Sequence, residues 1–360
     1  MSCDLQTMTR EWNQAFRARA TETRIPIAAT LELTRRCNLN CIHCYLGDQV
    51  EQHRRQPSEL DTGAVKQALT EWAEAGCLYL TLTGGEPLLR PDFAEIYRHA
   101  RELGLVVTVF TNGTLVTEQI TALFREYPPR KVEISLYGAT AATHDGITGH
   151  PGSHRRAWEG IRRLLAAGVR VELKTVLMKS NLAELEELER QAAGCGVPFR
   201  HDSALFPCLE GGSRAPLDLR ISPEEAVLAD LAAPYQKKQW RERIEAVLAV
   251  PPDERLYPCS AGRTAFHADP FGNLSPCILA EPYARASAGR SFSEIWEQEL
   301  GAIQERRWTR TDTCLTGDER GACAHCPAVN RMETGREEEE SDYMRRTAQL
   351  RYRAAMESNV

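Results

Sequence analysis

Strand–helix alternation is the feature that most constrains the fold of this chain. Between Ala28 and about Pro207, short β-rich runs alternate with stretches in which apolar residues recur three and four positions apart. The six strand candidates are "AATLELT", "LYLTLTG", "LVVTVFTNG", "KVEISLYG", "VRVELKTVLM" and "PFRHDSALF". Repeated units of this kind require parallel strands joined by helical crossovers. Because a closed barrel of this type has about eight strands, the pattern predicts an α/β fold with a partial, open (β/α)6 TIM-like barrel.

The remaining segments differ in character from the barrel. We expect an N-terminal extension over 1–27, the barrel over 28–207 and a helical linker over 208–250. Residues 251–340 are rich in Pro, Gly and Cys, and their weak periodicity predicts a small domain held together by metal. The charged remainder, 341–360, is predicted to be a helical tail.

Net charge and apolar content exclude two classes of partner. The chain of 360 residues carries a formal net charge of −6, which argues against a nucleic-acid partner held through phosphates. Its apolar runs are strand-sized and far too short to span a membrane. The first residues mix acids and bases and lack the apolar core of a secretion signal. We therefore expect a cytoplasmic protein without a membrane or nucleic-acid partner.

Twelve cysteines are a high count for a chain without an export signal. In a reducing compartment, clustered thiols more often bind metal than form disulfides. Eight of the twelve fall into two groups, and the scattered ones are Cys3, Cys77, Cys195 and Cys208. Cys77 and Cys195 stand beside glycines at predicted helix ends, so we expect both to be small buried side chains. For Cys208 the role stays open.

The first group, Cys37, Cys41 and Cys44, has the spacing C-x3-C-x2-C and directly follows the first strand. Iron–sulfur clusters usually take four thiolates, so three leave one iron open to an outside ligand. A loop after a barrel strand also lies at the face where such folds place active sites. The alternative is a structural zinc site with His43 as an extra ligand. Because His43 directly precedes Cys44, the two side chains could not easily occupy two corners of a tetrahedral zinc site.

Together with "LTGGEPLLRPDF" on the second strand, "CNLNCIHCY" resembles the radical S-adenosylmethionine (SAM) superfamily. The resemblance implies a 4Fe-4S cluster on the three cysteines, with SAM bound at the open iron and cleaved to a 5′-deoxyadenosyl radical. It also implies that the methionine amino group is held by Gly84, Gly85, Glu86 and Pro87. Adjacent glycines let the backbone approach a ligand closely, and a carboxylate suits an ammonium group.

Three further strand ends resemble weaker patterns of this superfamily. Asn112 in "FTNGT" falls near the nucleoside region, and Ser135 in "ISLYG" falls where relatives contact the cofactor. Lys174 in "LKTVLMKSN" falls near the cofactor carboxylate, where a basic residue makes sense. Ordinary strand-end polar chemistry is the alternative for all three. Many relatives have Asp where this chain has Tyr137, and no residue stands out as the catalytic acid or base.

The second group consists of Cys259, Cys277, Cys314, Cys323 and Cys326. Its beginning resembles the SPASM domain of peptide-modifying radical enzymes, and "DPFGNLSP" predicts a hairpin that brings Cys259 and Cys277 together. No cysteine follows Cys326, so two full auxiliary clusters lack ligands. The shortened "twitch" version implies one auxiliary iron–sulfur cluster, of 4Fe-4S type, on Cys259, Cys277, Cys323 and Cys326. Cys314 is an alternative ligand, and a zinc knuckle is an alternative site.

The resemblance implies a maturase that abstracts hydrogen from a ribosomally made peptide or protein. About 25 residues precede the first strand, too few for a leader-binding module. We therefore expect the peptide to be recognised by a separate protein or by the barrel face itself. We also expect flavodoxin or ferredoxin as reductant. Basic residues of the sixth strand and linker either line the open barrel side or are surface charges: Arg200, His201, Arg214 and Arg220. The alternatives are a radical dehydrogenase or modifier of a small molecule, including a tetrapyrrole, and a non-catalytic iron–sulfur scaffold.

Overall fold

One nine-stranded sheet organises the chain, whose computed structural model describes residues 4–209, 213–232, 234–280, 283, 285–287, 289–310, 316–323 and 326–357. The strand order is β6-β5-β4-β3-β2-β1-β7-β8-β9. The strands are β1 (Ala28–Glu32), β2 (Tyr79–Thr83), β3 (Val106–Thr111), β4 (Lys131–Ser135), β5 (Val171–Val176), β6 (Phe199–Asp202), β7 (Ala265–Ala268), β8 (Asn273–Ser275) and β9 (Arg285–Ala286). Strands β1 to β6 pair in parallel with their sequence neighbours, so the predicted partial barrel is confirmed.

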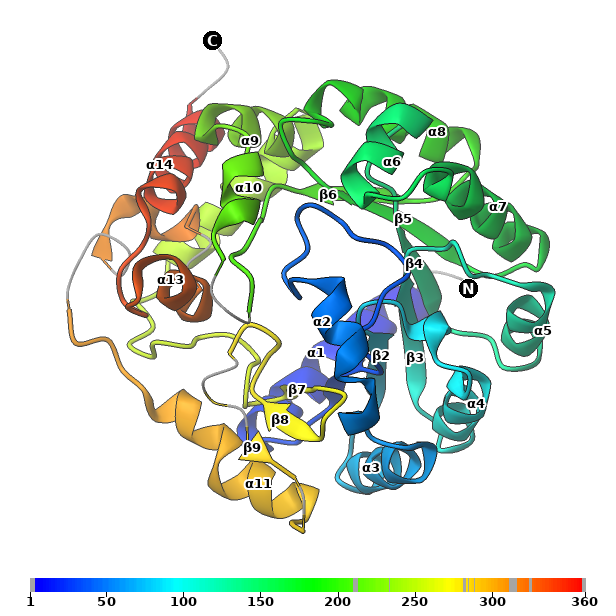
Figure 1. Cartoon of the computed structure of the whole chain (residues 1–360). Coiled ribbons are helices and arrows are strands. Elements are labelled where there is room, and N and C mark those ends of the chain that lie inside the picture. Colours follow the sequence, from blue (N-terminus) through cyan, green and yellow to red (C-terminus); the bar gives the residue numbers. More distant parts are fainter. Residues whose placement is uncertain are drawn as a thin grey trace.

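The described helices are α1 (Asp4–Thr23), α2 (Gln49–Arg54), α3 (Thr62–Glu74), α4 (Phe93–Glu102), α5 (Glu118–Glu126), α6 (Ala141–Thr148), α7 (Ser153–Ala166), α8 (Leu185–Gly194), α9 (Pro223–Asp230), α10 (Pro234–Leu248), α11 (Phe292–Gln298), α13 (Pro327–Thr334) and α14 (Asp342–Met356). Helices α3 to α8 lie around the outer side of the curved sheet, whereas α2 lies over its middle (Figure 1). Several helices begin at a residue whose side chain caps the first turn. Asp61 accepts from the backbone N–H of Ala64 before α3, and Thr117 accepts from that of Ile120 before α5.

The two faces of the barrel strands differ in polarity. Leu82, Val109 and Ile134 point outward and are fully buried in the main apolar core. Because side chains alternate along a strand, the neighbouring positions face the barrel interior, and several of these are polar or charged, including Glu32 and Glu133. Burial of the apolar face stabilises the barrel, whereas the interior holds charged groups that pair with one another, such as Arg35 with Glu32 and Lys174 with Glu133.

The cysteine-rich segment extends the barrel sheet, and its described residues form no separate sheet. Strand β7 pairs in parallel with β1, with Ala29 opposite Phe266, and β8 returns antiparallel to β7. The predicted hairpin is therefore confirmed, and Asp269 stabilises its turn by accepting from the backbone N–H groups of Phe271 and Asn273. An open barrel leaves the edge of β1 unpaired. Strand β7 covers that edge, which explains why the sheet has more strands than the six expected from the sequence.

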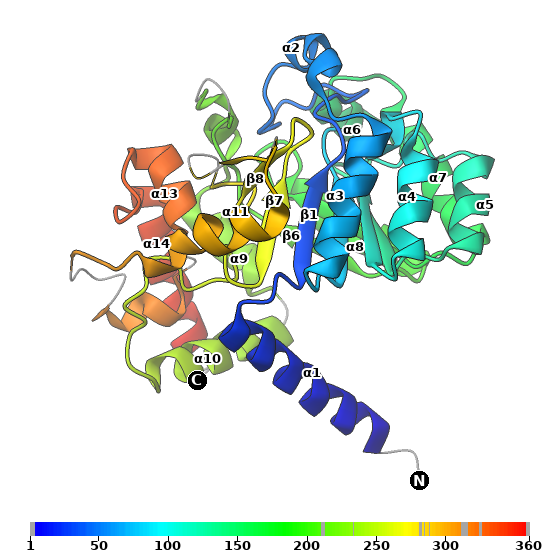
Figure 2. The ribbon, with the colours of Figure 1, turned by 90° about the horizontal axis from the view of Figure 1, so that it is seen from below.

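The two ends of the molecule carry different elements. Helix α1 projects away from the body at one end, whereas α2 lies at the opposite end (Figure 2). Helices α9 and α10 lie in the segment predicted as a helical linker, and α14 lies in the predicted tail. Among the residues that the structure describes, no helix is both long and apolar enough to cross a membrane.

Candidate active site

The loop that carries the first three cysteines is anchored on both sides. The backbone N–H of Cys37 donates to Gln49 Oε1 of α2 at 2.7 Å. The N–H groups of Asn40 and Ile42 donate to the carbonyl oxygens of Thr148 and Ile147, at the end of α6. These contacts hold the loop at the carboxyl ends of the strands without any regular structure of its own.

The three thiols are close neighbours. Burial, together with the nearby charges of Glu86 and Cys44, raises the pKa of Cys37 to about 12. Burial also raises the pKa of Cys41, and the nearby thiols of Cys44 and Cys37 raise it as well. Without a metal these thiols therefore stay protonated at neutral pH, whereas coordination would deprotonate them. Within the described residues, no three or more His, Cys, Asp or Glu side chains are close enough together to hold a single metal ion.

Polar groups around the thiols fit an iron–sulfur group, whose sulfurs accept hydrogen bonds. Gln49 Nε2 is buried and has no hydrogen-bond partner among the described residues. Asn112 Nδ2 lies 3.7 Å from Cys37 Sγ. Burial lowers the pKa of His43 to about 4, so its ring is neutral, and it packs edge-on against Tyr137 with ring centroids 4.5 Å apart.

The two glycines at the end of β2 let the chain approach the cysteine loop. A Cβ on Gly84, whose φ is +137°, would lie 2.1 Å from the carbonyl oxygen of Thr34. A Cβ on Gly85 would lie 2.3 Å from that of Arg36, immediately before Cys37. From the sequence, we expected the two glycines to let the backbone approach a ligand. In the structure, they are required because the backbone of β2 passes close to the main chain of the cysteine loop.

The carboxylate of Glu86 is enclosed by donors from neighbouring strand ends. Its Oε1 accepts from Thr111 Oγ1 at 2.8 Å and from the N–H of Leu88 at 3.0 Å, and its Oε2 accepts from the N–H of Asn112 at 2.7 Å. Burial raises the pKa of Glu86 to about 7, because its effect outweighs that of these hydrogen bonds, which lower the pKa. Glu86 thus ties the end of β2 to the end of β3 beside the thiols.

Ser135 and Lys174 are directly opposite each other on β4 and β5. Burial lowers the pKa of Lys174 to about 8. Its Nζ lies 3.6 Å from Glu133 Oε2 and 3.3 Å from the centre of the Phe110 ring. Tyr137 was set apart in the sequence only by its departure from the family pattern. It is half-buried, has a pKa raised by burial, hydrogen-bonds to Ser135 and lies near Cys41. It therefore belongs to the site.

The second group brings three thiols together. Burial raises the pKa of Cys277 to about 11, with further contributions from Cys326 and Cys259. Cys326 stands at the N-terminus of α13, where backbone N–H groups contact its sulfur. Cys323 instead donates its S–H to Glu340 Oε1 at 2.6 Å. Cys314 lies outside the described residues.

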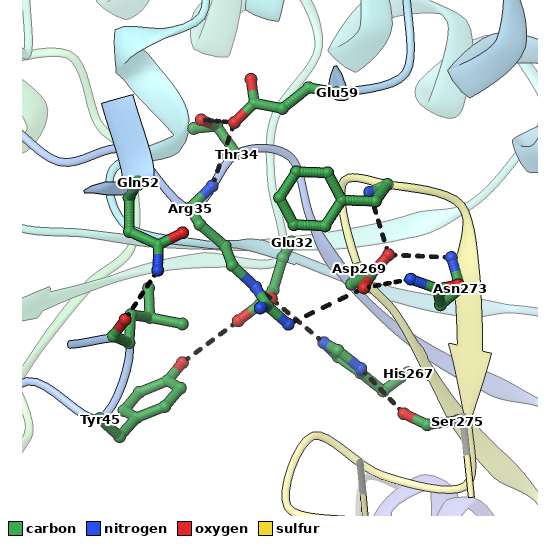
Figure 3. A network of polar contacts seen from close by, with 12 residues as sticks. Glu32, Thr34, Arg35, Tyr45, Gln52, Glu59, His267, Asp269, Asn273 and Ser275 are labelled. Carbon is green, nitrogen blue, oxygen red and sulfur yellow. Dashed lines mark hydrogen bonds and ion pairs between the residues drawn. The ribbon is translucent and has the colours of Figure 1, made fainter. Parts of the chain in front are cut away.

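A buried polar network joins the cysteine loop to the β7–β8 hairpin (Figure 3). Glu32, at the end of β1, accepts from Arg35 Nε at 3.3 Å and lies 3.5 Å from the hydroxyl of Tyr45, next to Cys44. Its Oε2 is 3.7 Å from His267 Nε2, and Arg35 also lies 3.8 Å from Asp269. His267 Nδ1 also lies 3.1 Å from Ser275 Oγ, which donates to the carbonyl oxygen of Cys277 at 3.0 Å. The network therefore reaches from the residue beside Cys44 to the backbone of Cys277.

The scattered cysteines and basic residues occupy varied places. Cys77 is buried as expected, but Cys195 is exposed, so the prediction for it was wrong. It follows the last residue of α8, where the helix end faces solvent. Arg200 pairs with Glu133 at 2.7 Å and Arg220 with Glu333 at 2.5 Å, so both are structural partners rather than free surface charges.

Comparison with known proteins places this site in a family. The Radical SAM superfamily model matches residues 31–192. The chain is 30% identical to the AdoMet-dependent heme synthase of Methanosarcina barkeri, over 89% of this chain and 97% of that protein. It is 35% identical to the mycofactocin maturase MftC of Mycobacterium tuberculosis, over 83% of this chain and 76% of that protein.

The fold is shared with a solved structure of SuiB from Streptococcus suis bound to the precursor peptide SuiA. The TM-score is 0.69 at 16% identity, over 91% of this chain and 78% of that one. Membership of the superfamily implies a 4Fe-4S cluster and SAM binding. The chain belongs to the radical SAM superfamily of enzymes.

Proposed function

We propose that this enzyme uses SAM to abstract a hydrogen atom from a ribosomally made peptide or protein and so modifies it after translation. The observation that carries this proposal is the placement of two thiol groups on one buried network, within a chain that is 35% identical to a peptide maturase. The fold shared with a peptide-bound enzyme supports it further.

The first thiol group has the role of binding the catalytic cluster. Cys37, Cys41 and Cys44 hold it, and Gln49 and Asn112 donate hydrogen bonds toward its sulfurs. When bound, the cluster supplies the electron that splits SAM into methionine and a 5′-deoxyadenosyl radical.

SAM itself is held by strand ends of the barrel in this proposal. The main chain at Gly84, Gly85 and Pro87 binds the methionine amino group, and Glu86 keeps that main chain in place through its three hydrogen bonds. Ser135 and Lys174 bind the SAM carboxylate, because they are paired in register and Lys174 is a partly buried basic side chain. Asn112 positions the nucleoside side of the site.

The second thiol group holds one auxiliary iron–sulfur cluster of 4Fe-4S type. Cys259, Cys277 and Cys326 supply three ligands, since their thiols are already neighbours. The fourth ligand is Cys323 after release from Glu340, or Cys314. We further propose a flavodoxin or ferredoxin as the reductant, a separate recognition protein for the peptide, and a cytoplasmic location.

A second candidate is a radical SAM enzyme that modifies a tetrapyrrole. The specific observation in its favour is 30% identity to an AdoMet-dependent heme synthase along 97% of that protein. Both candidates share the chemistry of the first site and differ in what fills the space beside it.

The test is anaerobic reconstitution with iron and sulfide, followed by incubation with SAM and dithionite. Formation of 5′-deoxyadenosine by the wild type, and its loss in Cys41→Ala, supports radical SAM chemistry. The reaction is then repeated with a short peptide encoded beside the gene, or with an iron porphyrin that carries extra carboxylate side chains. Only the true substrate class should increase the formation of 5′-deoxyadenosine, and we expect that to be the peptide. Stimulation by the porphyrin alone would replace the peptide proposal with the second candidate.

A further inference from the structure

A pocket of about 170 Å³ lies between the two thiol groups. On one side it is lined by Cys208, whose S–H donates to the carbonyl oxygen of Cys44 at 3.6 Å. On the other side it is lined by Tyr257 and Ala328, which belong to the apolar cluster that packs against Cys277 and Cys326. The pocket therefore adjoins both proposed cluster sites while being lined by neither set of ligands.

One acidic lining residue is already neutralised. Glu337 is buried and accepts from the hydroxyl of Tyr257 at 2.9 Å and from that of Tyr283 at 2.5 Å. Its other oxygen pairs with Arg306 at 2.5 Å. Because three donors occupy this carboxylate, it adds no free negative charge to the pocket.

One basic lining residue has no such partner. Arg331, in the last turn of α13, is exposed, and its guanidinium makes no hydrogen bond or ion pair with the part of the chain that the structure describes. Arginine is always protonated in proteins and presents a planar fork that binds carboxylates in a bidentate manner. The pocket thus combines apolar walls with one uncompensated cation.

The volume limits what enters. An apolar cavity of about 150 Å³ holds one benzene molecule, so this pocket admits a group about the size of one aromatic side chain or one substituted pyrrole ring. Its charge selects among such groups, because a buried carboxylate would be paired by Arg331 whereas an amine would be repelled.

We propose that this pocket binds a carboxylate-bearing part of the substrate, and that Arg331 is the residue that recognises the carboxylate. The inference rests on the proposed function, since it names the substrate chemistry of the same site. The carboxylate comes either from a peptide or from a propionate group of a tetrapyrrole.

The experiment measures binding by calorimetry to the anaerobically reconstituted wild type, Arg331→Gln and a control, Arg336→Gln. Arg336 is exposed nearby, pairs with Glu339 at 3.6 Å and does not line the pocket. The probes are acetyl-Gly-Gly-Tyr with a free carboxylate, the same peptide as its amide, hemin, and hemin dimethyl ester. Production of 5′-deoxyadenosine by the wild type is measured separately, so that a failure of the proposed function is distinguished from a failure of this inference.

A charge-assisted pair predicts that Arg331→Gln raises the dissociation constant of a free acid roughly tenfold or more. The same change should leave the amide or ester unaffected, and Arg336→Gln should behave as the wild type does. An effect confined to the peptide acid identifies a peptide carboxylate, and one confined to hemin identifies a propionate. The inference is overturned if neither acid binds more tightly than its neutral form, or if Arg331→Gln weakens acid and neutral probes equally.

Discussion

Glu32 Oε2 and His267 Nε2 lie 3.7 Å apart, and they connect the first barrel strand with the strand that opens the cysteine-rich hairpin. Burial tends to raise the pKa of Glu32, but the nearby His267 and the hydrogen-bonded Arg35 outweigh it and lower the pKa below 4.5. The ionised carboxylate thus stabilises the joint between the two thiol groups.

Replacing Glu32 by Gln should lower the free energy of unfolding by about 3 kcal/mol near pH 7, because Arg35 then loses its closest buried partner. A lowered pKa stabilises the fold above the unfolded value of 4.5, and this contribution is lost as pH falls through the folded value. Urea unfolding at pH 7 and pH 4 should therefore show a smaller difference between wild type and Glu32→Gln at the lower pH. Glu95→Gln, which breaks a surface pair with Lys66, is the control and should cost about 1 kcal/mol or less. Equal stability of Glu32→Gln and wild type at pH 7 would contradict this role.

Gly85→Ala should disturb the cysteine loop. The new Cβ would lie 2.3 Å from the carbonyl oxygen of Arg36, so the loop or the strand end must shift, at about 1–3 kcal/mol. We expect a lower urea midpoint and fewer iron atoms per chain after reconstitution. Gly194→Ala is the matched control, because no heavy atom lies within 4 Å of its Cβ position. Normal iron content in Gly85→Ala would show that the close approach does not position the cysteines.

Glu86 should make the metal-free protein less stable as pH rises. Its pKa is raised by burial from 4.5 to about 7, so the fold is favoured while the group is protonated and loses stability as pH increases between these two values. The loss amounts to about 3 kcal/mol. Glu86→Gln should remove this slope when urea unfolding is measured from pH 5 to pH 8, whereas the exposed change Glu102→Gln should retain it. An unchanged slope in Glu86→Gln would assign the pH dependence to other groups.

Single serine replacements should show which cysteines of the second group bind the auxiliary cluster. Cys326→Ser removes a thiol that is already close to Cys259 and Cys277, so we expect iron per chain to fall by about half while the first cluster is retained. The result for Cys323→Ser decides whether that residue leaves Glu340 to become a ligand. Cys195→Ser is the control, since its thiol is exposed and distant in sequence from both groups. Full iron content in Cys326→Ser, measured together with SAM cleavage, would exclude Cys326 from the auxiliary site.

Local patterns in the sequence predicted the barrel and the first site well, because both depend on neighbouring residues. Periodicity set the strands, and each motif followed the strand that carries it, so Gly85 meets Arg36, directly before Cys37, where β1 and β2 end side by side. The pairing of β7 with β1 joins segments far apart in the chain. The contact of Glu32 with His267 depends on that pairing and could not be read from either segment alone.

Individual side-chain environments were harder to predict than the placement of strands. Cys195 resembles Cys77 in its sequence surroundings, yet one is exposed and the other buried. Their difference depends on which helix end faces solvent. Cys323 and Cys326 are separated by two residues, yet Cys323 donates to Glu340 whereas Cys326 lies near Cys259 at the start of α13.

The central claim is that Cys37, Cys41 and Cys44 leave one iron open to SAM. Its most direct measurement is the electron paramagnetic resonance spectrum of reduced Cys277→Ser/Cys326→Ser protein, which retains only the first thiol group, recorded before and after SAM is added. The account predicts a spectrum typical of one reduced 4Fe-4S cluster whose g values shift when SAM binds. A zinc-loaded protein without that spectrum, or a cluster whose spectrum SAM leaves unchanged, would contradict it.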